Sequence, residues 1–459
     1  MKLPRQLLVG VALAAFMAGS VSALAGAQGV TTGAIGGKVT DEADAALAGV
    51  NITAVNRANG FSSSVNSRAD GRYLIPNLEV GVYDLTFRRV GFDPIRRRDL
   101  VVALSQVLKQ DVQLSARATE LSGVTIVAAT TTETFTPTNT SVKTIVTDTT
   151  LQRLPSLSRN IIDMVRVSPQ VSTSGAGYSA GGMSNRMNNV QIDGATERDV
   201  FGLGATGTPG AETNSRSVSL EAVKELQVLL APFDVRQGNF GGLLVNAVTK
   251  GGTNDMHGSV YGYYRDQDYG RNVPQLRATP FDRTQYGFSF GGPIIKDKLH
   301  FFVAPEWQSE NTPVSGTYLG QPAELTPVFP IKDADLTRFE QLMAAKGMPD
   351  FGTPGYANIP NPLLNMFARL DYQINDVHRS VLRYNYSEGE RLRQQNNRGA
   401  TAAVYSGNFH TFDTWKIAPV FQLFSVFKGG TSNELFVGYN RARNRRTPES
   451  PYPQITVSA

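Results

Sequence analysis

The chain has 459 residues, of which 41% are hydrophobic and 18% charged, a composition typical of folded rather than disordered proteins. It has no cysteine, which excludes disulfides, thiolate metal sites and cysteine nucleophiles, and its four histidines lack metal-ligand spacing. A net charge of +5 is too small in a chain of this length to indicate nucleic-acid binding. We therefore expect no cofactor and no nucleic-acid partner.

The first residues have the pattern of a secretory signal peptide. Basic residues precede a short apolar run at residues 7–17, and small residues follow up to an A-x-A site that ends at Ala27. The alternative, a transmembrane anchor, needs an apolar run of about 18 residues or more. We expect residues 1–27 to be removed by cleavage between Ala27 and Gln28, and the mature protein to be exported.

Residues 30–116 have the alternating pattern of a small all-β domain. Apolar and polar residues alternate along several short segments, which gives each strand one buried face. Short strands at this spacing indicate a β-sandwich of about seven strands. The Asp70-Gly71 pair predicts a hairpin turn between residues 61–67 and 72–75.

The next two regions differ in character. Residues 117–150 are rich in threonine and poor in bulky side chains, which predicts a linker with one short β-prone patch. Residues 151–255 are mixed, with helices expected at 159–167 and near 220–225 and a strand at 243–249. Their glycine density predicts a compact domain of tight turns.

Residues 256–459 carry about seven segments in which side chains alternate strictly. Tyr286, Phe288 and Phe290 share one parity, whereas Gln285 and Ser289 share the other. Successive side chains of a strand point to opposite faces, so each predicted strand has an apolar, aromatic-rich face and a polar face.

The connections between these strands form a second, independent pattern. Short turns at residues 293–298 and 375–379 alternate with long connections at 265–283, 310–365 and 388–410. Transmembrane β-barrels have short periplasmic turns and long extracellular loops, whereas a soluble sandwich has no reason to sort its loops by length. One long connection is predicted to carry a helix, capped by Asp335 and closed by Gly347.

Three ordered groups of residues are familiar as a set. They are found at 69–73 and 80–83, at 189–194, 219–226 and 248–254, and at 291–302. In this order they resemble the carboxypeptidase regulatory-like domain, the plug domain and the first periplasmic hairpin of TonB-dependent outer-membrane receptors of the Oar-like branch.

The resemblance implies a mostly β fold in three parts. These are a small β-sandwich, then an α+β plug domain at 151–255, then the first strands of an incomplete outer-membrane antiparallel β-barrel. Family members close barrels of about twenty-two strands, and residues 256–459 are too few for that many strands at about 10 residues each. We therefore expect the chain to be the front part of a longer product.

The family also implies a TonB box, a short extended segment that pairs edge-on with a strand of the energy-transducing protein TonB. The linker contains a β-prone segment that resembles it, and the alternative is the last strand of the preceding domain or an ordinary linker. The candidate box consists of Leu121, Ser122, Gly123, Val124, Thr125, Ile126 and Val127.

Four plug residues fall on the family's most recognisable pattern, namely Arg186, Asn189, Asp193 and Gly194. We interpret them as a turn and polar cluster that seats the plug and releases it when pulled. The equally plausible alternative is a hairpin turn with ordinary hydrogen bonds. Neither interpretation makes them catalytic.

Two other motifs carry weaker signals. The segment Gly177-Tyr178-Ser179-Ala180-Gly181 has the spacing of a serine-hydrolase nucleophile, but it lacks the strand before and the helix after that this chemistry requires. Arg96-Arg97-Arg98 is the densest basic run, and is interpreted as a solvated loop or as a contact for acidic groups.

The functional hypothesis is a receptor in the outer membrane of a Gram-negative cell, in contact with outer-membrane lipid. The plug and the N-terminal domain would lie on the periplasmic side, and TonB would power import of a small substrate. Siderophore, carbohydrate and peptide receptors share these features, so the substrate stays open. The alternative is a surface adhesion or structural protein without transport, which would need neither box nor plug. An enzyme is not expected.

Overall fold

The computed structural model describes residues 31–116, 125–128, 143–154, 156, 159–172, 177–199, 207–230, 237–238, 240–269, 281–313, 317–321, 329, 331–348, 352–394, 404–429 and 431–450. The predicted signal peptide and residues Leu121 to Val124 of the candidate box lie outside this part. Among the helices in these ranges, none is long and apolar enough to cross a membrane. The predicted fold class, mostly β with an N-terminal sandwich, is confirmed.

The N-terminal domain, residues 33–113, consists of two sheets that face each other across an apolar core. One sheet has the order β4-β1-β7 with β8 also on β1, and the other has the order β3-β2-β5-β6-β9. Alternate residues of β2 and β5, such as Ile52 and Leu85, are fully buried in the core between them. The strands are β1 (Gly33–Thr40), β2 (Asn51–Asn56), β3 (Ser62–Asn66), β4 (Arg72–Leu78), β5 (Gly81–Arg88), β6 (Ile95–Val102), β7 (Val107–Lys109), β8 (Val112–Gln113) and β9 (Thr125–Ala128).

The hairpin predicted around Asp70-Gly71 is wrong in its pairing. The chain does turn there, since Arg68 N donates to Arg72 O, and Gly71 has a φ of 74°. However, β3 pairs with β2 whereas β4 pairs with β1. The turn therefore leads from one sheet of the sandwich to the other, which local turn chemistry does not distinguish from a hairpin.

The plug sheet, defined here as β10, β15, β16, β13 and β14 in that order, is mixed. Val190, Leu226 and Val245 lie on the face that packs against two short helices and against Phe302 and Phe367 of the following region. The elements are β10 (Lys143–Thr147), α2 (Asp148–Arg153), α3 (Ile161–Val165), β11 (Val171–Ser172), β12 (Ser179–Ala180), η1 (Asn185–Met187), β13 (Asn189–Ile192), β14 (Ala195–Thr196), η2 (Ala211–Thr213), η3 (Leu220–Ala222), β15 (Val223–Leu229) and β16 (Leu244–Thr249).

The helix expected near residues 220–225 is wrong. Only a single 3-10 turn, η3, is present, and β15 begins directly after it. The strand pairs on both sides, with β10 and with β16, and it buries Leu226 and Val228 on one face. Tertiary pairing therefore overrides the short helical pattern. The helix expected at 159–167 is present in a shorter form as α3.

The wall, defined here as β17 to β26, is one antiparallel sheet of ten strand segments. Three pairs of segments continue each other across two-residue breaks, namely β19 and β20, β23 and β24, and β25 and β26. Both members of each pair lie along the same neighbouring pass of the sheet. The ten segments thus make seven passes. They are β17 (His257–Asp266), β18 (Asp282–Ile295), β19 (Leu299–Val303), β20 (Glu306–Pro313), β21 (Asn358–Gln373), β22 (His378–Gln394), β23 (Phe409–Ile417), β24 (Val420–Val426), β25 (Ser432–Gly438) and β26 (Arg441–Pro448).

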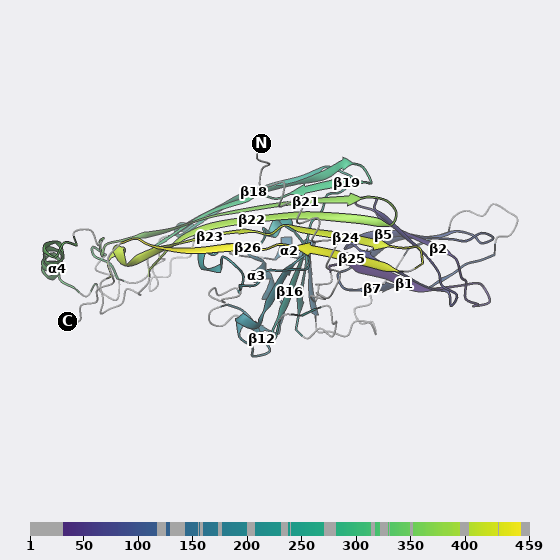
Figure 1. Ribbon diagram of the computed structural model, residues 1–459, viewed down its shortest axis with the longest axis horizontal. Helices are drawn as coiled ribbons and strands as arrows, with labels where there is room; N and C mark the ends of the chain where they lie inside the picture. Colours follow the sequence, from purple (N-terminus) through teal and green to yellow (C-terminus); the bar gives the residue numbers. More distant parts are fainter. Residues whose placement is uncertain are drawn as a thin grey trace, which may run out of the picture.

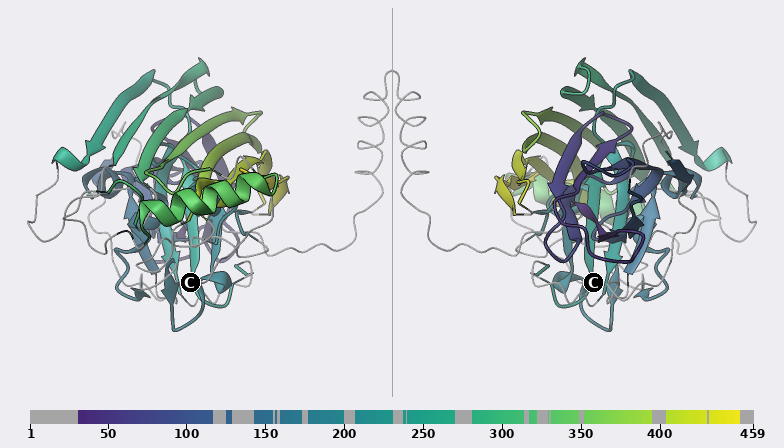
Figure 2. Two further views of the ribbon diagram at one scale, coloured as in Figure 1. Left: turned by 90° about the vertical axis from the view of Figure 1, so that its left-hand side faces the viewer. Right: turned by 90° about the vertical axis from the view of Figure 1, so that its right-hand side faces the viewer.

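The wall arches over the plug sheet, and the N-terminal domain lies at one end of it (Figures 1 and 2). That end carries the short turns between β18 and β19, β21 and β22, and β24 and β25. Helix α4 (Asp333–Ala345) lies at the opposite end, in the long connection between β20 and β21 (Figure 1). Its N-cap is Lys332 rather than the predicted Asp335, whereas Gly347 has a φ of 80° directly after the helix.

The wall strands show the predicted alternation of an apolar and a polar face. Compared with a soluble protein the two faces are inverted, with the apolar face outside. Tyr286 and Tyr384 are 53% and 44% exposed on the outer face, whereas Arg383 and Lys416 are almost completely buried on the inner face. A soluble protein buries its apolar residues, so a sheet with its aromatic side outward and its charged side inward matches a wall in lipid.

Candidate functional site

The last two residues of the plug motif, Asp193 and Gly194, form a tight turn between β13 and β14. Asp193 and Gly194 have φ angles of 45° and 79°, the left-handed conformations that a two-residue Asp-Gly turn requires. The Asp193 carboxylate reaches beyond its own turn. Its two oxygens accept hydrogen bonds from Thr249 N at 2.8 Å and from Thr249 Oγ1 at 2.7 Å. Asp193 therefore fastens the turn to the last residue of β16.

The wall supplies a cation to the same carboxylate. Arg383 of β22 places Nη1 3.4 Å from Asp193 Oδ2, and its side chain is 1% exposed. Within the described residues, the guanidinium nitrogens of Arg383 have no hydrogen-bond partner. The charge of Arg383 is therefore balanced mainly by an ion pair with the plug rather than by neighbours in its own sheet.

A second ion pair joins the same two parts. Lys416 of β23 contacts Glu197, which follows β14, and both side chains are completely buried. Gln422 of β24 lies 3.5 Å from the backbone carbonyl of Asp193. Charged groups this deeply buried are retained only when they are paired. Two buried ion pairs, Asp193–Arg383 and Glu197–Lys416, thus hold the β13–β14 hairpin to the wall.

A third connection runs from β16 into the wall through Arg369 of β21. Its Nη1 donates to the carbonyl oxygen of Thr249 at 2.9 Å, and Nε donates to Asp371 Oδ2 at 2.9 Å. Thr249 therefore binds Asp193 with its N–H and hydroxyl, and Arg369 with its carbonyl. The plug motif and the wall form one continuous buried polar chain.

A separate cluster seats the segment before β15. Arg216 lies 2.7 Å from Glu306 Oε1 of β20, with both side chains buried. The other oxygen of Glu306 accepts from Ser219, Tyr261 and Gln285 at 2.8–3.0 Å. Both oxygens of the carboxylate thus have donors, which compensates a charge that burial would otherwise disfavour.

The structure separates the four residues of the predicted motif. Asp193 and Gly194 form the turn, and Asn189 is buried in β13, where its Nδ2 donates to Gly238 O at 3.2 Å. Arg186 is exposed on η1 and its carbonyl accepts from Arg198, so it does not join Asp193.

The wall residues Arg369, Arg383 and Lys416 were missed by sequence reasoning. Arg369 and Arg383 occupy the polar parity of predicted strands, where a cation was the available signal, whereas Lys416 lies in no strand that the sequence pattern identified.

The serine motif has no catalytic surroundings in the described part of the chain. Ser179 lies in β12 and pairs with Ser172 of β11, and no hydrogen bond joins it to a histidine or an acid. All four histidines are on wall strands. Among the residues that the structure describes, no group of three potential ligands could hold a metal ion.

The basic run is not the solvated loop that was expected. Arg96, Arg97 and Arg98 belong to strand β6. Arg96 Nη2 lies 2.7 Å from Asp84, and Arg97 Nη1 donates to Gln110 at 2.6 Å. Two of the three side chains thus have partners inside the N-terminal domain.

The described part of the candidate box, three of its seven residues, forms a strand. Strand β9 contains Thr125, Ile126 and Val127 and pairs in parallel with β6, with Thr125 opposite Ile95 and Val127 opposite Arg97. These residues are thus paired edge-on with the N-terminal domain.

Comparisons with known proteins identify two regions. Residues 34–115 match the carboxypeptidase regulatory-like domain, and residues 248–329 match an outer membrane beta barrel domain. The chain is 26% identical over 273 residues to TonB-dependent transporter Oar of Myxococcus xanthus, covering 56% of this chain and 25% of the relative. It is 28% identical over 170 residues to the probable TonB-dependent siderophore receptor PirA of Acinetobacter baumannii, covering 34% and 21%.

Similar solved structures include a siderophore receptor and an outer membrane transporter. The siderophore receptor PirA from Acinetobacter baumannii has a TM-score of 0.46 at 20% identity, covering 66% of this chain and 40% of that one. The outer membrane transporter YddB from Escherichia coli has a TM-score of 0.45 at 15% identity, covering 65% and 38%. The chain spans about a quarter of the length of the curated relatives it matches. The chain is homologous to TonB-dependent transporter Oar and to siderophore receptors, with a carboxypeptidase regulatory-like domain ahead of outer membrane β-barrel strands.

Proposed function

We propose that this protein is a TonB-dependent receptor that imports a small substrate across the outer membrane, with residues 151–255 acting as its plug. The observation that carries the proposal is the inverted wall, whose charged inner face holds the plug sheet through buried ion pairs. A plug inside a lipid-facing wall serves to control passage through it, a role for which an adhesive protein has no need.

The outer face of the wall supports a location in lipid. Its exposed large side chains are apolar or aromatic over most of the passes, from β17 to β25. They include Val260, Tyr264, Tyr286, Phe288, Phe290, Met366, Leu370, Tyr372, Leu382, Tyr384, Leu435 and Val437. The short turns lie beside the N-terminal domain, and short turns are periplasmic in such barrels. The N-terminal domain and plug would then face the periplasm.

The seat of the plug has a chemistry suited to reversible release. Buried ion pairs add little net stability because desolvation offsets their attraction. When such a contact opens, water solvates both charges, whereas an opened apolar interface loses its whole burial energy. The pairs Asp193–Arg383 and Glu197–Lys416 would therefore fix the position of the plug and still let it leave under load.

The energy source proposed is TonB, acting through the candidate box at residues 121–127. Strand addition needs a segment that adopts an extended conformation and offers backbone groups to a neighbouring edge. Thr125 to Val127 adopt the extended conformation that strand addition needs. They form the end strand of the N-terminal sheet, as the alternative for this segment expects, so TonB would pair with the free edge of β9 or displace β6 from it. The substrate belongs to the siderophore, carbohydrate or peptide classes, and one relative is named as a siderophore receptor.

The test uses the cysteine-free background of the chain. Gln191 in β13 is fully buried, and neither of its amide atoms has a partner in the described residues, so Gln191→Cys removes no hydrogen bond. The full-length Gln191→Cys protein is exposed to N-ethylmaleimide in cells with and without TonB. Labelling of Gln191→Cys should be faster in cells with TonB. The further substitution Ile126→Pro, which breaks the strand of the candidate box, should abolish this difference.

Two controls make the result specific. Proline at Val101, on β6 outside the box, tests whether any strand break in this region has the same effect. Isolated outer membranes, which have no energised TonB, should be labelled by N-ethylmaleimide only at the slow rate seen in cells without TonB. Equal labelling in cells with and without TonB would refute the transport proposal and favour an adhesive or structural role.

A further inference from the structure

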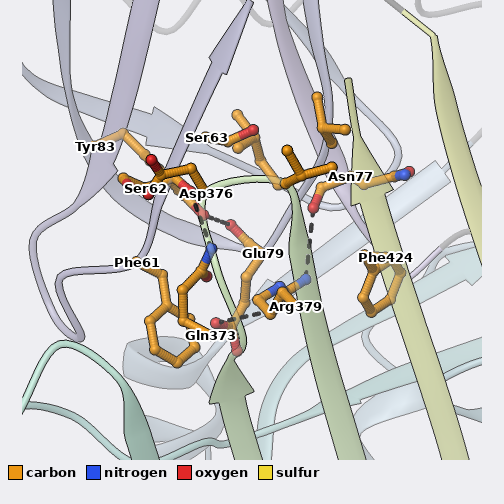
Figure 3. Close-up of a pocket in the computed structure, with 13 residues that line it drawn as sticks. Phe61, Ser62, Ser63, Asn77, Glu79, Tyr83, Gln373, Asp376, Arg379 and Phe424 are labelled. Atoms are coloured by element: carbon orange, nitrogen blue, oxygen red, sulfur yellow. Dashed lines mark hydrogen bonds and ion pairs between the residues drawn. The ribbon is translucent and has the colours of Figure 1, made fainter. Parts of the chain in front are cut away.

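The N-terminal domain inserts one carboxylate into the wall. Glu79 lies in the turn between β4 and β5, and its side chain is 9% exposed. Oε1 is 2.8 Å from Arg369 Nη2 of β21, and Oε2 is 3.6 Å from Arg379 Nη1 of β22. Asn59 of the same domain donates to Oε2 at 3.2 Å. Figure 3 shows Glu79 and Arg379 meeting at this junction.

Glu79 is held in its charged form. Burial raises the pKa of a carboxyl group, but here the positive charges of Arg369, Lys224 and Arg379 outweigh burial and lower the pKa of Glu79 to about 2. A carboxylate placed between two arginines of the wall is a specific contact, because removing it leaves Arg369 with Asp371 as its one remaining carboxylate in the described structure.

Arg369 is shared between the N-terminal domain and the plug. One guanidinium contacts Glu79 through Nη2 and the carbonyl oxygen of Thr249 through Nη1. Thr249 in turn binds Asp193, the residue of the plug motif. The polar chain described above therefore begins in the N-terminal domain and ends at Arg383 in the wall.

The same domain also covers a strand of the plug sheet directly. Lys224 of β15 donates to the carbonyl oxygen of Val80, next to Glu79. Glu225 of β15 accepts a hydrogen bond from Leu104 N at 3.2 Å. The plug strand that is contacted here, β15, lies between β10 and β16 in the sheet.

Contacts around the rim are mostly polar and backbone-mediated. Asn254 N donates to Ala58 O at 2.7 Å, and Asn66 N donates to Lys428 O at 3.1 Å. Gln373 Nε2 lies 3.3 Å from Ser62 O. A small cavity remains beside Glu79, bounded by residues of both parts (Figure 3). The interface also has apolar contacts, since Val80 and Leu104 cluster with Val248 of β16, and Val426 of β24 joins the core of the N-terminal domain. An interface that combines polar contacts, a few apolar ones and an unfilled space resembles a contact between separable domains.

The candidate box is attached to this same domain, because β9 pairs with β6. A load applied to the box therefore reaches the N-terminal domain as well as the plug.

From these contacts we infer that the N-terminal domain is a removable cover over the plug, anchored by Glu79 on Arg369, and that it must leave its seat before the plug can move. The inference rests on the proposed transport function for its last step. The anchoring itself does not, and it can be tested without TonB.

The first experiment locks the cover. Asn66 and Lys428 are exposed, and a backbone hydrogen bond of 3.1 Å joins them across the interface, so the pair Asn66→Cys and Lys428→Cys places two cysteines on adjacent backbones for disulfide formation. The full-length protein carries this pair in one sample and Asn66→Cys alone in the control.

The readout is the TonB-dependent release of the plug, measured by a reporter that needs no third cysteine. We use a photo-reactive amino acid at Ser217, whose buried hydroxyl has no partner in the described residues and whose carbonyl oxygen accepts a hydrogen bond from Asn385 of β22. Its cross-links to the wall should form only while the plug is seated. With TonB, loss of these cross-links should slow by about tenfold or more in the oxidised pair, a change of about 1.4 kcal/mol per decade. Reductant should restore it, and the single-cysteine control should not respond.

The second experiment tests the anchor without TonB. Glu79→Gln keeps the size and the bond from Asn59 but removes the charge that faces Arg369. In the Asn66→Cys, Lys428→Cys background, disulfide formation should slow several-fold, whereas Glu42→Gln, at an exposed site of the same domain, should leave it unchanged.

The outcomes separate the two proposals. Equal release of the plug in the oxidised and reduced pair overturns the cover, even if transport occurs. An unlocked protein without any TonB-dependent release overturns transport and with it the role of the domain as a cover, whereas the anchor is still decided by the Glu79→Gln comparison. Unchanged disulfide formation in Glu79→Gln overturns the anchor.

Discussion

Replacing Asp193 with asparagine should loosen the plug from the wall. Asparagine tolerates the positive φ of 45° at this position and still offers an oxygen to Thr249 N, so the turn itself should persist. What is lost is the negative charge 3.4 Å from Arg383. In the described residues no other carboxylate lies within 4.0 Å of that guanidinium.

The expected magnitude follows from burial. Arg383 is 1% exposed, and removing one partner of a buried ion pair costs about 3–5 kcal/mol because the other charge stays uncompensated. The length of the contact and the absence of a hydrogen bond place this pair at about 3 kcal/mol, the low end of that range. The seated state should lose about two orders of magnitude in its equilibrium constant. The double variant with Arg383→Met should recover most of this loss, because no buried charge is then left alone.

The assay measures plug opening in urea. Gln227→Cys reports on β15, two strands from Asp193, and its amide atoms have no partner in the described residues. Maleimide labelling as a function of urea gives the free energy of opening for the parent, both single variants and the double variant. Losses below about 0.5 kcal/mol in both single variants would refute the reasoning, as would a double variant that is fully additive.

Three further predictions concern the other contacts. Lys416→Met should cost about 3–5 kcal/mol of plug opening energy in the same assay, and Glu197→Gln added to it should return most of that loss; an unimproved double variant would contradict the pairing. The pKa of Glu79 is lowered from 4.5 to about 2, so Glu79 stabilises docking of the N-terminal domain on the wall fully above pH 4.5, and this contribution is lost as the pH falls toward 2. A spin-label distance across the interface should lengthen in that window, and Glu79→Gln should show no such transition. Gly252→Ala should reduce the folded yield, because its new Cβ would meet two backbone carbonyl oxygens at 2.9 Å or less, whereas Gly262→Ala enters open space and should be neutral.

Much of the fold follows from patterns that are local in the sequence. The parity of Tyr286, Phe288 and Phe290 assigned a strand and its two faces, because side-chain direction in a strand has a period of two residues. Asp193-Gly194 specified its turn for a similar reason, since few residue pairs adopt two successive left-handed conformations.

The errors lie where pairing is decided at a distance. The segment near residues 220–225 has a short helical pattern, but β15 gains partners on both edges that no local window contains. The turn after β3 has hairpin chemistry, yet β4 crosses to the other sheet, because the sandwich needs two faces to bury its apolar residues.

The candidate site was the least predictable part. The sequence alone determined that Asp193 sits in a turn and that Arg369 and Arg383 lie on the polar parity of their strands. Only the tertiary structure decided which charges meet, because Glu79 and Arg369 are 290 residues apart and each wall cation could have faced any plug carboxylate. The side to which a side chain points is fixed by its own backbone, whereas its partner is fixed by how the plug sheet, the N-terminal domain and the wall pack together.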